Sequence, residues 1–554
     1  MAWTETMDEG RKFSRKWKAL ALGVVLVSAC RSEEIPAPPP APVLASGASP
    51  ARGGTLVVAV GEDIRTLDPQ RIIDTVSLLG GQLLFGTLLD YPAEGIPTRA
   101  NLEPSLAESW STSPDGRTFT FTIRDSARFS DGSPIVAEDF VYALDRILTP
   151  ETTSPVASFF AGIEGASDRL GGKASSTTGL VALDPRTLRI RLEKVDPSFP
   201  LLLTMVQTTP QRRTYVEAQG SALGTKPLGS GLFRPRAYHP GQELLLERNP
   251  YFWNHERPLL DAVRIRLAMP RESMLLSFLQ GDIDLLDARI CEDALLIARE
   301  PLWAPYIERA PLYVATADLF NNKKPPFSDK RVRQAFNYAI NREDSARLSN
   351  GRVIPANGFL PPQMLGYKKD RPVWPLDREK AKSLLAQAGY DHGLEVTYTT
   401  LRDEMAQKIA LSMRDDLEKI GVRMSIETLT FPAYLASLSR GDLTFAFSSW
   451  TMDFPDPWDF LEVKFHSRMI AAGTNDTGYQ NAEVDRLLDL ARLELDEENR
   501  GALYQKAEDI IVEDCPNLWH YFSMSVDVRQ PWVQGRIRHP ARDLFFRDTW
   551  VAGR

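Results

Sequence analysis

The chain has 554 residues, of which 43% are hydrophobic and 25% are charged, and its formal net charge at pH 7 is -8. These fractions are typical of a soluble globular protein and exclude a disordered chain, a collagen and a polytopic membrane protein. A distributed acidic surface argues against nucleic-acid binding, and three cysteines are too few for a disulfide scaffold. At about 150 residues per domain, the length predicts three or four domains.

The first 29 residues predict an export signal. A basic cluster ending at Lys18 precedes an uncharged run, ALALGVVLVSA, that is too short to span a bilayer as a helix. The run closes with Val27-Ser28-Ala29-Cys30, which is similar to the bacterial lipobox, in which the cysteine is lipidated. The alternative is an ordinary signal peptide with a chance cysteine. Residues 30–54, rich in proline, alanine, serine and glycine, predict a tether between a lipid anchor at Cys30 and the folded part.

A small α+β unit is predicted over residues 118–192. The buried run TLVVAV at 55–60 predicts a strand that precedes this unit. Within the unit, a strand over 118–124 has alternating apolar side chains, a helix over 137–148 has an apolar face, and 187–192 returns to strand alternation.

The clearest architecture lies between Leu394 and Trp450. Strands and helices alternate there at a spacing that implies right-handed crossovers and a parallel sheet. Because ligands bind outside the carboxyl ends of such strands, we expect the residues after Phe447 to matter most. The predicted strands are 394–400, 422–429 and 443–447, and the predicted helices are 403–420 and 431–439.

Motifs for catalysis or cofactor binding are missing from the sequence. There is no G-x-S-x-G, H-E-x-x-H, C-x-x-C or complete P-loop, and the six histidines have no metal-ligand spacing. We therefore expect no catalytic residue, no metal and no cofactor, although paired carboxylates are common enough that counting does not exclude a glycosidase. Cys291 and Cys515 form either one disulfide or two buried thiols, and the sequence leaves both open.

Several ordered segments together resemble the extracytoplasmic solute-binding proteins of ABC importers, in particular the peptide-binding family. Residues 102–146 contain AESW, DGRTFTF, RDSARFSDGSP and AEDF in the order of that family's signature. The pair PLGSGLF and ERNPYFW, at 227–233 and 247–253, is similar to two further family blocks, as are residues 320–342 and 475–488. The resemblance runs from about Gly54 to beyond Trp519.

The resemblance implies an α/β fold in which two lobes close on a ligand, with an inserted third α+β domain. Lobe I is expected at 54–97, 225–312 and 521–554, the inserted domain II at 98–224, and lobe II (domain III) at 313–520. In such a closure a few connecting residues change conformation, and the ligand stabilises the closed state.

The resemblance also implies a ligand-binding residue, Asp453. In peptide-binding members, the aspartate of a W-x-x-D-(Y/F)-x-(D/E)-P stretch pairs with the α-ammonium group of the peptide, and Trp450 to Pro457 matches this stretch. A carboxylate at the carboxyl end of a strand, beside aromatic side chains, is partly desolvated and suited to holding a cation. The alternative is that Asp453 only caps a turn. Asp456 is expected to be structural.

Four further residues are candidates to contact the ligand. Trp450 and Met452 are expected to line the pocket, and Asn475 and Tyr479 are weaker candidates. Some members carry an arginine for the ligand carboxylate six residues before the aspartate, and this chain has Phe447 there. The length of the ligand, and whether it ends in a carboxylate, therefore stay open.

The resulting prediction is a lipid-anchored, non-enzymatic peptide receptor that delivers its ligand to an ABC permease and works as a monomer outside the cytoplasm. One alternative keeps the scaffold and changes the ligand to a metal chelate, an oligosaccharide or another nutrient. An anchored hydrolase and a sensor that works without a transporter are also compatible with the sequence.

Overall fold

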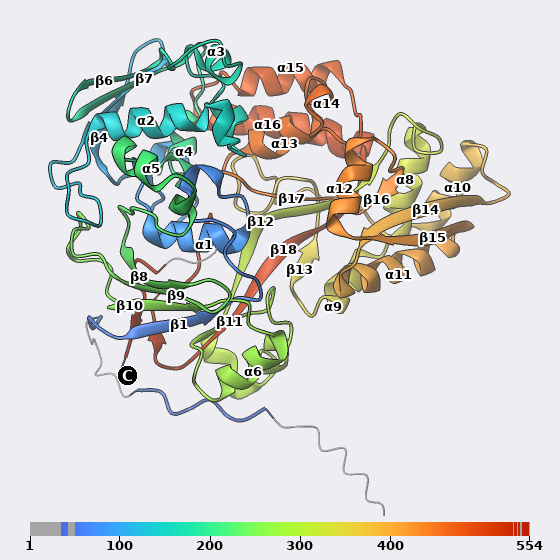
Figure 1. Cartoon of the computed structure of the whole chain (residues 1–554). Coiled ribbons are helices and arrows are strands. Elements are labelled where there is room, and N and C mark those ends of the chain that lie inside the picture. Colours follow the sequence, from blue (N-terminus) through green and yellow to red (C-terminus); the bar gives the residue numbers. More distant parts are fainter. Residues whose placement is uncertain (1–34, 43–49, 536, 540, 543–545, 553–554) are drawn as a thin grey trace, which may run out of the picture. The chain divides into compact units, whose positions relative to one another are not determined.

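The structure is a computed structural model that describes residues 35–42, 50–535, 537–539, 541–542 and 546–552 (Figure 1). The chain divides into a short part up to Pro36 and the part from Ala37 onward, and the helices and strands assigned in the structure lie in the second. The predicted signal peptide and Cys30 fall outside the described residues. Within the described part of the chain, every helix is too short or too polar to cross a membrane.

The first of the larger sheets has the strand order β1-β10-β9-β8, with β1 and β10 parallel and the other neighbours antiparallel. Its inward side chains include Leu56, Val263 and Leu244, which share one buried apolar cluster with Leu83 of the helix α1. The predicted strand at 55–60 is confirmed. The elements are β1 (Thr55–Ala59), α1 (Thr75–Leu84), β8 (Phe233–His239), β9 (Glu243–Arg248) and β10 (Ala262–Arg266).

The predicted α+β unit is confirmed as a four-stranded antiparallel sheet with the order β4-β5-β7-β6. Phe119, Phe121 and Ile123 are buried beneath the helix α2, whose Phe140 and Leu144 enter the same core. The elements are β4 (Ala107–Thr112), β5 (Thr118–Ile123), α2 (Ala137–Ile147), α3 (Ala166–Leu170), β6 (Leu180–Asp184), β7 (Thr187–Arg191), α4 (Phe199–Leu202) and α5 (Arg213–Gln219).

An eight-stranded sheet contains the predicted parallel unit. Its order is β11-β18-β12-β16-β14-β15, with β13 added to β18 and β17 to β12, and β14 is parallel to both β15 and β16. The strand predicted at 443–447 is only two residues long as β16, because the following residues leave β14 to pair with β12 as β17. The elements are β11 (Leu285–Asp287), β12 (Ile307–Phe320), β13 (Val353–Pro355), β14 (Leu394–Leu401), α11 (Glu404–Glu418), β15 (Val422–Leu429), α12 (Phe431–Ser439), β16 (Phe445–Ala446), β17 (Ser449–Thr451) and β18 (Asn517–Arg529).

The two long strands β12 and β18 pair antiparallel along most of their length (Figure 1). The lobe boundaries expected at 312/313 and 520/521 fall inside these strands, and the register between them shifts between Pro311 and Ala315. A register shift bends a strand pair locally. Both β12 and β18, which connect the expected lobes, therefore change direction at this point.

The remaining elements cover the sheets or connect them. Asp329 caps the helix α8 by accepting a hydrogen bond from the Arg331 amide. Cys291 and Cys515 are buried free thiols, which decides between the two alternatives left open by the sequence. The bounds are β2 (Leu89–Asp90), β3 (Glu103–Pro104), α6 (Arg271–Leu279), α7 (Ala294–Ile297), α8 (Lys330–Ala339), α9 (Arg342–Leu348), α10 (Arg378–Gln387), α13 (Pro457–Phe465), α14 (Met469–Ala472), α15 (Ala482–Ala491), α16 (Glu497–Asp514), β19 (Val533–Gln534) and β20 (Trp550–Val551).

Candidate functional site

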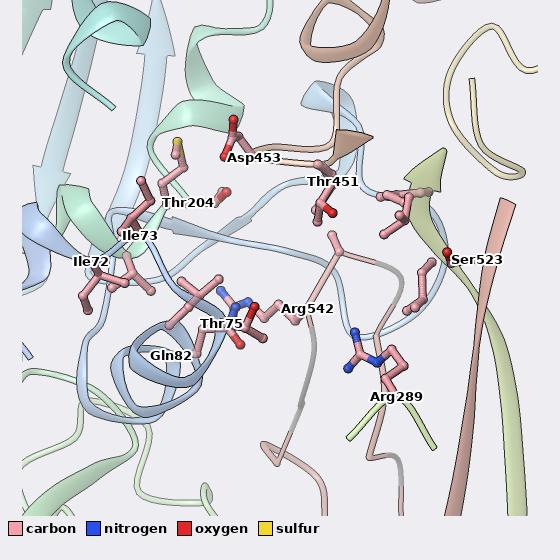
Figure 2. A pocket seen from close by; sticks show the side chains of 18 of the residues that line it. Ile72, Ile73, Thr75, Gln82, Thr204, Arg289, Thr451, Asp453, Ser523 and Arg542 are labelled. Carbon is pink, nitrogen blue, oxygen red and sulfur yellow. The ribbon is translucent and has the colours of Figure 1, made fainter. Parts of the chain in front are cut away.

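A cavity of about 690 Å³ is lined by residues from segments far apart in the sequence (Figure 2). Its volume is in the range of small-molecule sites, about 300–1,000 Å³. Asp403 and Met405 follow the carboxyl end of the parallel strand β14, as expected for an open parallel sheet, and Met452 and Asp453 follow the end of β17. Lining residues lie within 72–91, 155–156, 204–207, 312–314, 352–353, 403–405, 451–453, 523–524 and 541–542, together with Arg289.

Asp453 lines this cavity and is positioned by the strand β17. Thr451 pairs with Val314 of β12, and the Met452 amide donates to the Tyr313 carbonyl at 2.9 Å. The Asp453 amide then donates to Oδ2 of Asp459 at 2.8 Å, which turns the chain into α13. The backbone at Asp453 is therefore held from both sides, and the side chain is left to face the cavity (Figure 2).

Asp456 has the structural role that the sequence indicates. It caps α13 by accepting from the Trp458 amide at 3.0 Å, and both of its oxygens accept from Arg500 at 2.7 Å. Both side chains of this ion pair are almost fully buried. The pair fixes the start of α13 and hence the loop that carries Asp453.

The same loop packs against the inserted α+β unit. The Trp458 indole donates to the Ser198 hydroxyl at 2.7 Å, and Arg492 stacks on the Trp458 ring at 4.0 Å while pairing with Asp196 at 2.9 Å. Phe159 contacts both Phe454 and Trp458 edge to face. These contacts join the cavity loop to two sheets at once and restrict its movement.

Two carboxyl groups, Asp453 and Asp459, lie next to each other at this wall. The Asp453 side chain is exposed to the cavity, yet protein surrounds it on its other sides, and this desolvation raises its pKa from 3.8 to about 6. Asp459 is fully buried; burial, followed by the nearby charge of Asp453, raises its pKa well above the usual range. A second ionised carboxylate is disfavoured here, so a cation entering the cavity at Asp453 would relieve an electrostatic cost.

The other predicted contact residues divide into two groups. Met452 lines the cavity with Asp453, whereas Trp450 points away from it, with its ring 5.4 Å from the Lys464 ammonium. Trp450 therefore supports the loop behind Asp453.

Asn475 and Tyr479 are outside the cavity lining of the described chain. The Asn475 amide donates to the carbonyls of His466 and Tyr479, and the Tyr479 hydroxyl donates to Asp514 at 2.7 Å. These bonds hold both side chains within the fold, and their contact with the ligand stays a prediction.

Arginines from three different segments also line the cavity, and the sequence reasoning missed them. Arg289 forms a bidentate pair with Asp287, Arg352 pairs with Glu292 at 2.7 Å, and Arg542 pairs with Asp90 at 2.6 Å. None of them belongs to a local motif. Only the tertiary fold brings them to one cavity.

Metal-binding clusters of histidine, cysteine or carboxylate side chains do not occur among the residues with described positions. Each of the three arginines is paired with a carboxylate outside the cavity lining, whereas Asp453 faces the open space. The arrangement is that of a binding cavity with an acidic group on one wall and guanidinium groups elsewhere on its surface.

Comparison with known proteins places this architecture in a family. Residues 101–471 match the family described as bacterial extracellular solute-binding proteins, family 5 Middle. The periplasmic oligopeptide-binding protein OppA of Salmonella typhimurium is 27% identical over 546 residues, 95% of this chain and 96% of that protein. The probable deoxycholate-binding periplasmic protein YgiS of Escherichia coli is 28% identical over 499 residues, 87% of this chain and 91% of that protein.

The fold agrees with the same assignment. The unliganded open form of the periplasmic murein tripeptide-binding protein MppA is 26% identical, with a TM-score of 0.76, and the match covers 91% of this chain and 98% of that one. The two-lobed fold and the family predicted from the sequence are thus confirmed. The chain belongs to family 5 of the bacterial extracellular solute-binding proteins.

Proposed function

We propose that this protein is a lipid-anchored extracytoplasmic receptor that binds peptides between two closing lobes and delivers them to an ABC import permease. The observation that carries the proposal is Asp453, a cavity carboxylate whose pKa is raised to about 6 because no compensating charge offsets its desolvation. The α-ammonium group of a peptide supplies that charge. Relatives named for binding oligopeptides and a murein tripeptide support a peptide as the ligand.

The strand β17 offers a second recognition element. It is three residues long and is paired on one side with β12; among the described strands, none occupies its other edge. An extended peptide added there would form main-chain hydrogen bonds, which bind without regard to side-chain identity. This favours a receptor that accepts many peptide sequences.

Lobe closure is proposed with the domain bounds given above, with lobe I at 54–97, 225–312 and 521–554, domain II at 98–224 and lobe II at 313–520. The paired strands β12 and β18 would act as the hinge, since the register shift between Pro311 and Ala315 lies at the boundary. A ligand held by both walls stabilises the closed state by the contacts it makes only there.

The lipid anchor and the permease partners are proposed from the sequence and from the family. Acylation of Cys30 would hold the protein at the membrane, the segment 30–54 would space it from the bilayer, and the permease subunits would receive the closed, loaded form. We propose that the protein works as a monomer and has no enzymatic activity.

A second candidate ligand is a non-peptide solute. The observation that favours it is the similarity to a relative named for probable deoxycholate binding, together with apolar cavity side chains such as Ile73, Leu78 and Met524. Such a ligand would need no ammonium group and would not depend on Asp453.

Native mass spectrometry of residues 31–554, followed by denaturing release of whatever co-purifies, tests the proposal. Peptides released from the wild-type protein, and lost in the Asp453→Asn variant, are the expected result. A released bile acid, sugar or metal chelate would replace the peptide as ligand, and cleavage of added peptides would contradict a receptor.

A further inference from the structure

Three arginines from different segments of the chain line the cavity. Two of them are engaged by the protein. All three guanidinium nitrogens of Arg352 donate to Ser349, Ala288 or Glu292, and Arg289 is held by both oxygens of Asp287. Protein acceptors thus hold Arg352 through all three nitrogens and Arg289 through Nε and Nη2.

Arg542 differs from the other two. Of its guanidinium nitrogens, only Nη2 is paired, with Asp90 at 2.6 Å, when the described residues are considered. The guanidinium lies over the Tyr91 ring at 5.2 Å, and the preceding His539 stacks on the same ring. The Arg542 amide donates to the His539 carbonyl, so the turn that carries the side chain is fixed. Arg542 is therefore held in place and still has guanidinium N–H groups that can donate to a ligand.

Gln82 is the second unsatisfied group in this region. Its Oε1 is buried without a hydrogen-bond partner in the described structure, although α1 holds the side chain at the cavity wall. A buried amide oxygen without a partner costs free energy until a donor reaches it. The amide oxygen can accept from the last N–H of a peptide, and its NH₂ group can donate to the terminal carboxylate.

Both residues also line a second chamber of about 240 Å³ that adjoins the main cavity. The volume suits the side chain of one ligand residue rather than a whole ligand, since a small-molecule site needs about 300 Å³ or more. Figure 2 shows Gln82 and Arg542 in the same cavity as Asp453, on a different wall. A ligand with an ammonium group at one end and a carboxylate at the other would thus meet complementary groups at both ends.

We propose that Arg542 and Gln82 bind the carboxylate end of the ligand, so that this protein selects short peptides with a free carboxyl terminus. The inference rests on the proposed function, because it takes the ammonium end to lie at Asp453.

The test uses two randomised tripeptide libraries, identical except that one has free carboxyl termini and the other carboxyamides. Both are offered together to residues 31–554, and native mass spectrometry measures the acid-to-amide ratio of the bound peptides. We expect the wild-type protein to favour the acids by about 10- to 100-fold, as charge-assisted hydrogen bonds do. Arg542→Ala should bring the ratio close to one, with Arg542→Lys intermediate and Gln82→Leu reduced.

The ratio is measured within the folded, peptide-loaded population, so partial unfolding of a variant does not change it. Arg423→Gln, which removes an exposed charge far from the cavity lining, is the control and should keep the wild-type ratio. A wild-type ratio near one, or an unchanged ratio in Arg542→Ala, overturns the inference while leaving peptide binding intact. Loss of selectivity in Arg289→Gln instead would move the carboxylate subsite there. If neither library binds, the proposed function itself fails.

Discussion

Replacing Asp453 by asparagine is the most informative single change, because it should affect binding and stability in opposite directions. Asparagine keeps the size of the side chain and removes its charge. In the ligand-free protein the pKa of Asp453 is raised from 3.8 to about 6, so the folded state holds a proton there more tightly than the unfolded chain does. Stability at this group is therefore greatest below about pH 4 and falls as the pH rises through 6.

The size of the stability effect follows from that shift. About two pKa units correspond to about 3 kcal/mol before screening, but the side chain is exposed to cavity water, which reduces the expected gain to about 1 kcal/mol. Ligand-free Asp453→Asn should thus melt about 1 °C higher than wild type at pH 7. Binding of a free-amine peptide should weaken by about 2–5 kcal/mol, or roughly 30-fold to several thousand-fold.

Titration calorimetry with the same peptide at pH 7 and pH 5 gives the decisive measurement. The peptide ammonium is protonated at both values, whereas Asp453, with a pKa of about 6, loses most of its charge by pH 5. Wild-type affinity should fall about tenfold over this range, and Asp453→Asn should show no such fall. Asp403→Asn is the matched control, because Asp403 also faces the cavity and asparagine can keep its cap on α11.

Two results would refute this reasoning. Affinity of Asp453→Asn within threefold of wild type for a free-amine peptide would remove the ammonium site. A tenfold pH dependence that persists in Asp453→Asn would mean that another group titrates, and the buried neighbour Asp459 would be the first to examine.

Three further changes test the lipid anchor at Cys30, the buried Arg500–Asp456 pair that supports the Asp453 loop, and the predicted ligand contact at Tyr479. Cys30→Ser should move the protein from the detergent phase to the aqueous phase, and persistence with the membrane would contradict the lipobox. Arg500→Met should lower the free energy of unfolding by about 3–5 kcal/mol, because it leaves the buried carboxylate of Asp456 unpaired; urea unfolding measures this, and a loss below 1 kcal/mol would show that the pair is dispensable. Tyr479→Phe removes the hydroxyl bond to Asp514 and should cost about 1 kcal/mol of stability, while a more than threefold change in peptide affinity would support the predicted ligand contact.

The secondary structure between Leu394 and Trp450 could be predicted because its signals are local. The strand at 422–429 and the helix at 431–439 have the bounds that their apolar periodicity indicates. The pairing of β12 with β18 could not be predicted in this way, since about 200 residues separate them in the chain. Nothing in either segment alone specifies its partner or the register shift between Pro311 and Ala315.

Residues of the candidate site could be predicted only where they belong to a sequence motif. Asp453 lies within such a motif, and the structure places it in the cavity. Asn475 and Tyr479 also belong to a family segment, but asparagine and tyrosine serve equally well to build a loop, which is what their hydrogen bonds do. Arg542 and Gln82 have no motif at all. Their unsatisfied donors and acceptors become visible only when the cavity assembles residues from distant segments.

The location of Asp453 connects ligand binding to the hinge. Thr451 pairs with Val314, and Met452 bonds to Tyr313, so the loop carrying the carboxylate is attached to β12 directly beside the register shift. Arg542 is held instead by Asp90 and Tyr91, which belong to neither β12 nor β17. If the lobes close by bending at the register shift, as proposed, the separation of the two charged groups changes with closure. A zwitterionic peptide that pairs with both groups would favour the form in which their separation fits it, and under the proposed function that form is the closed one.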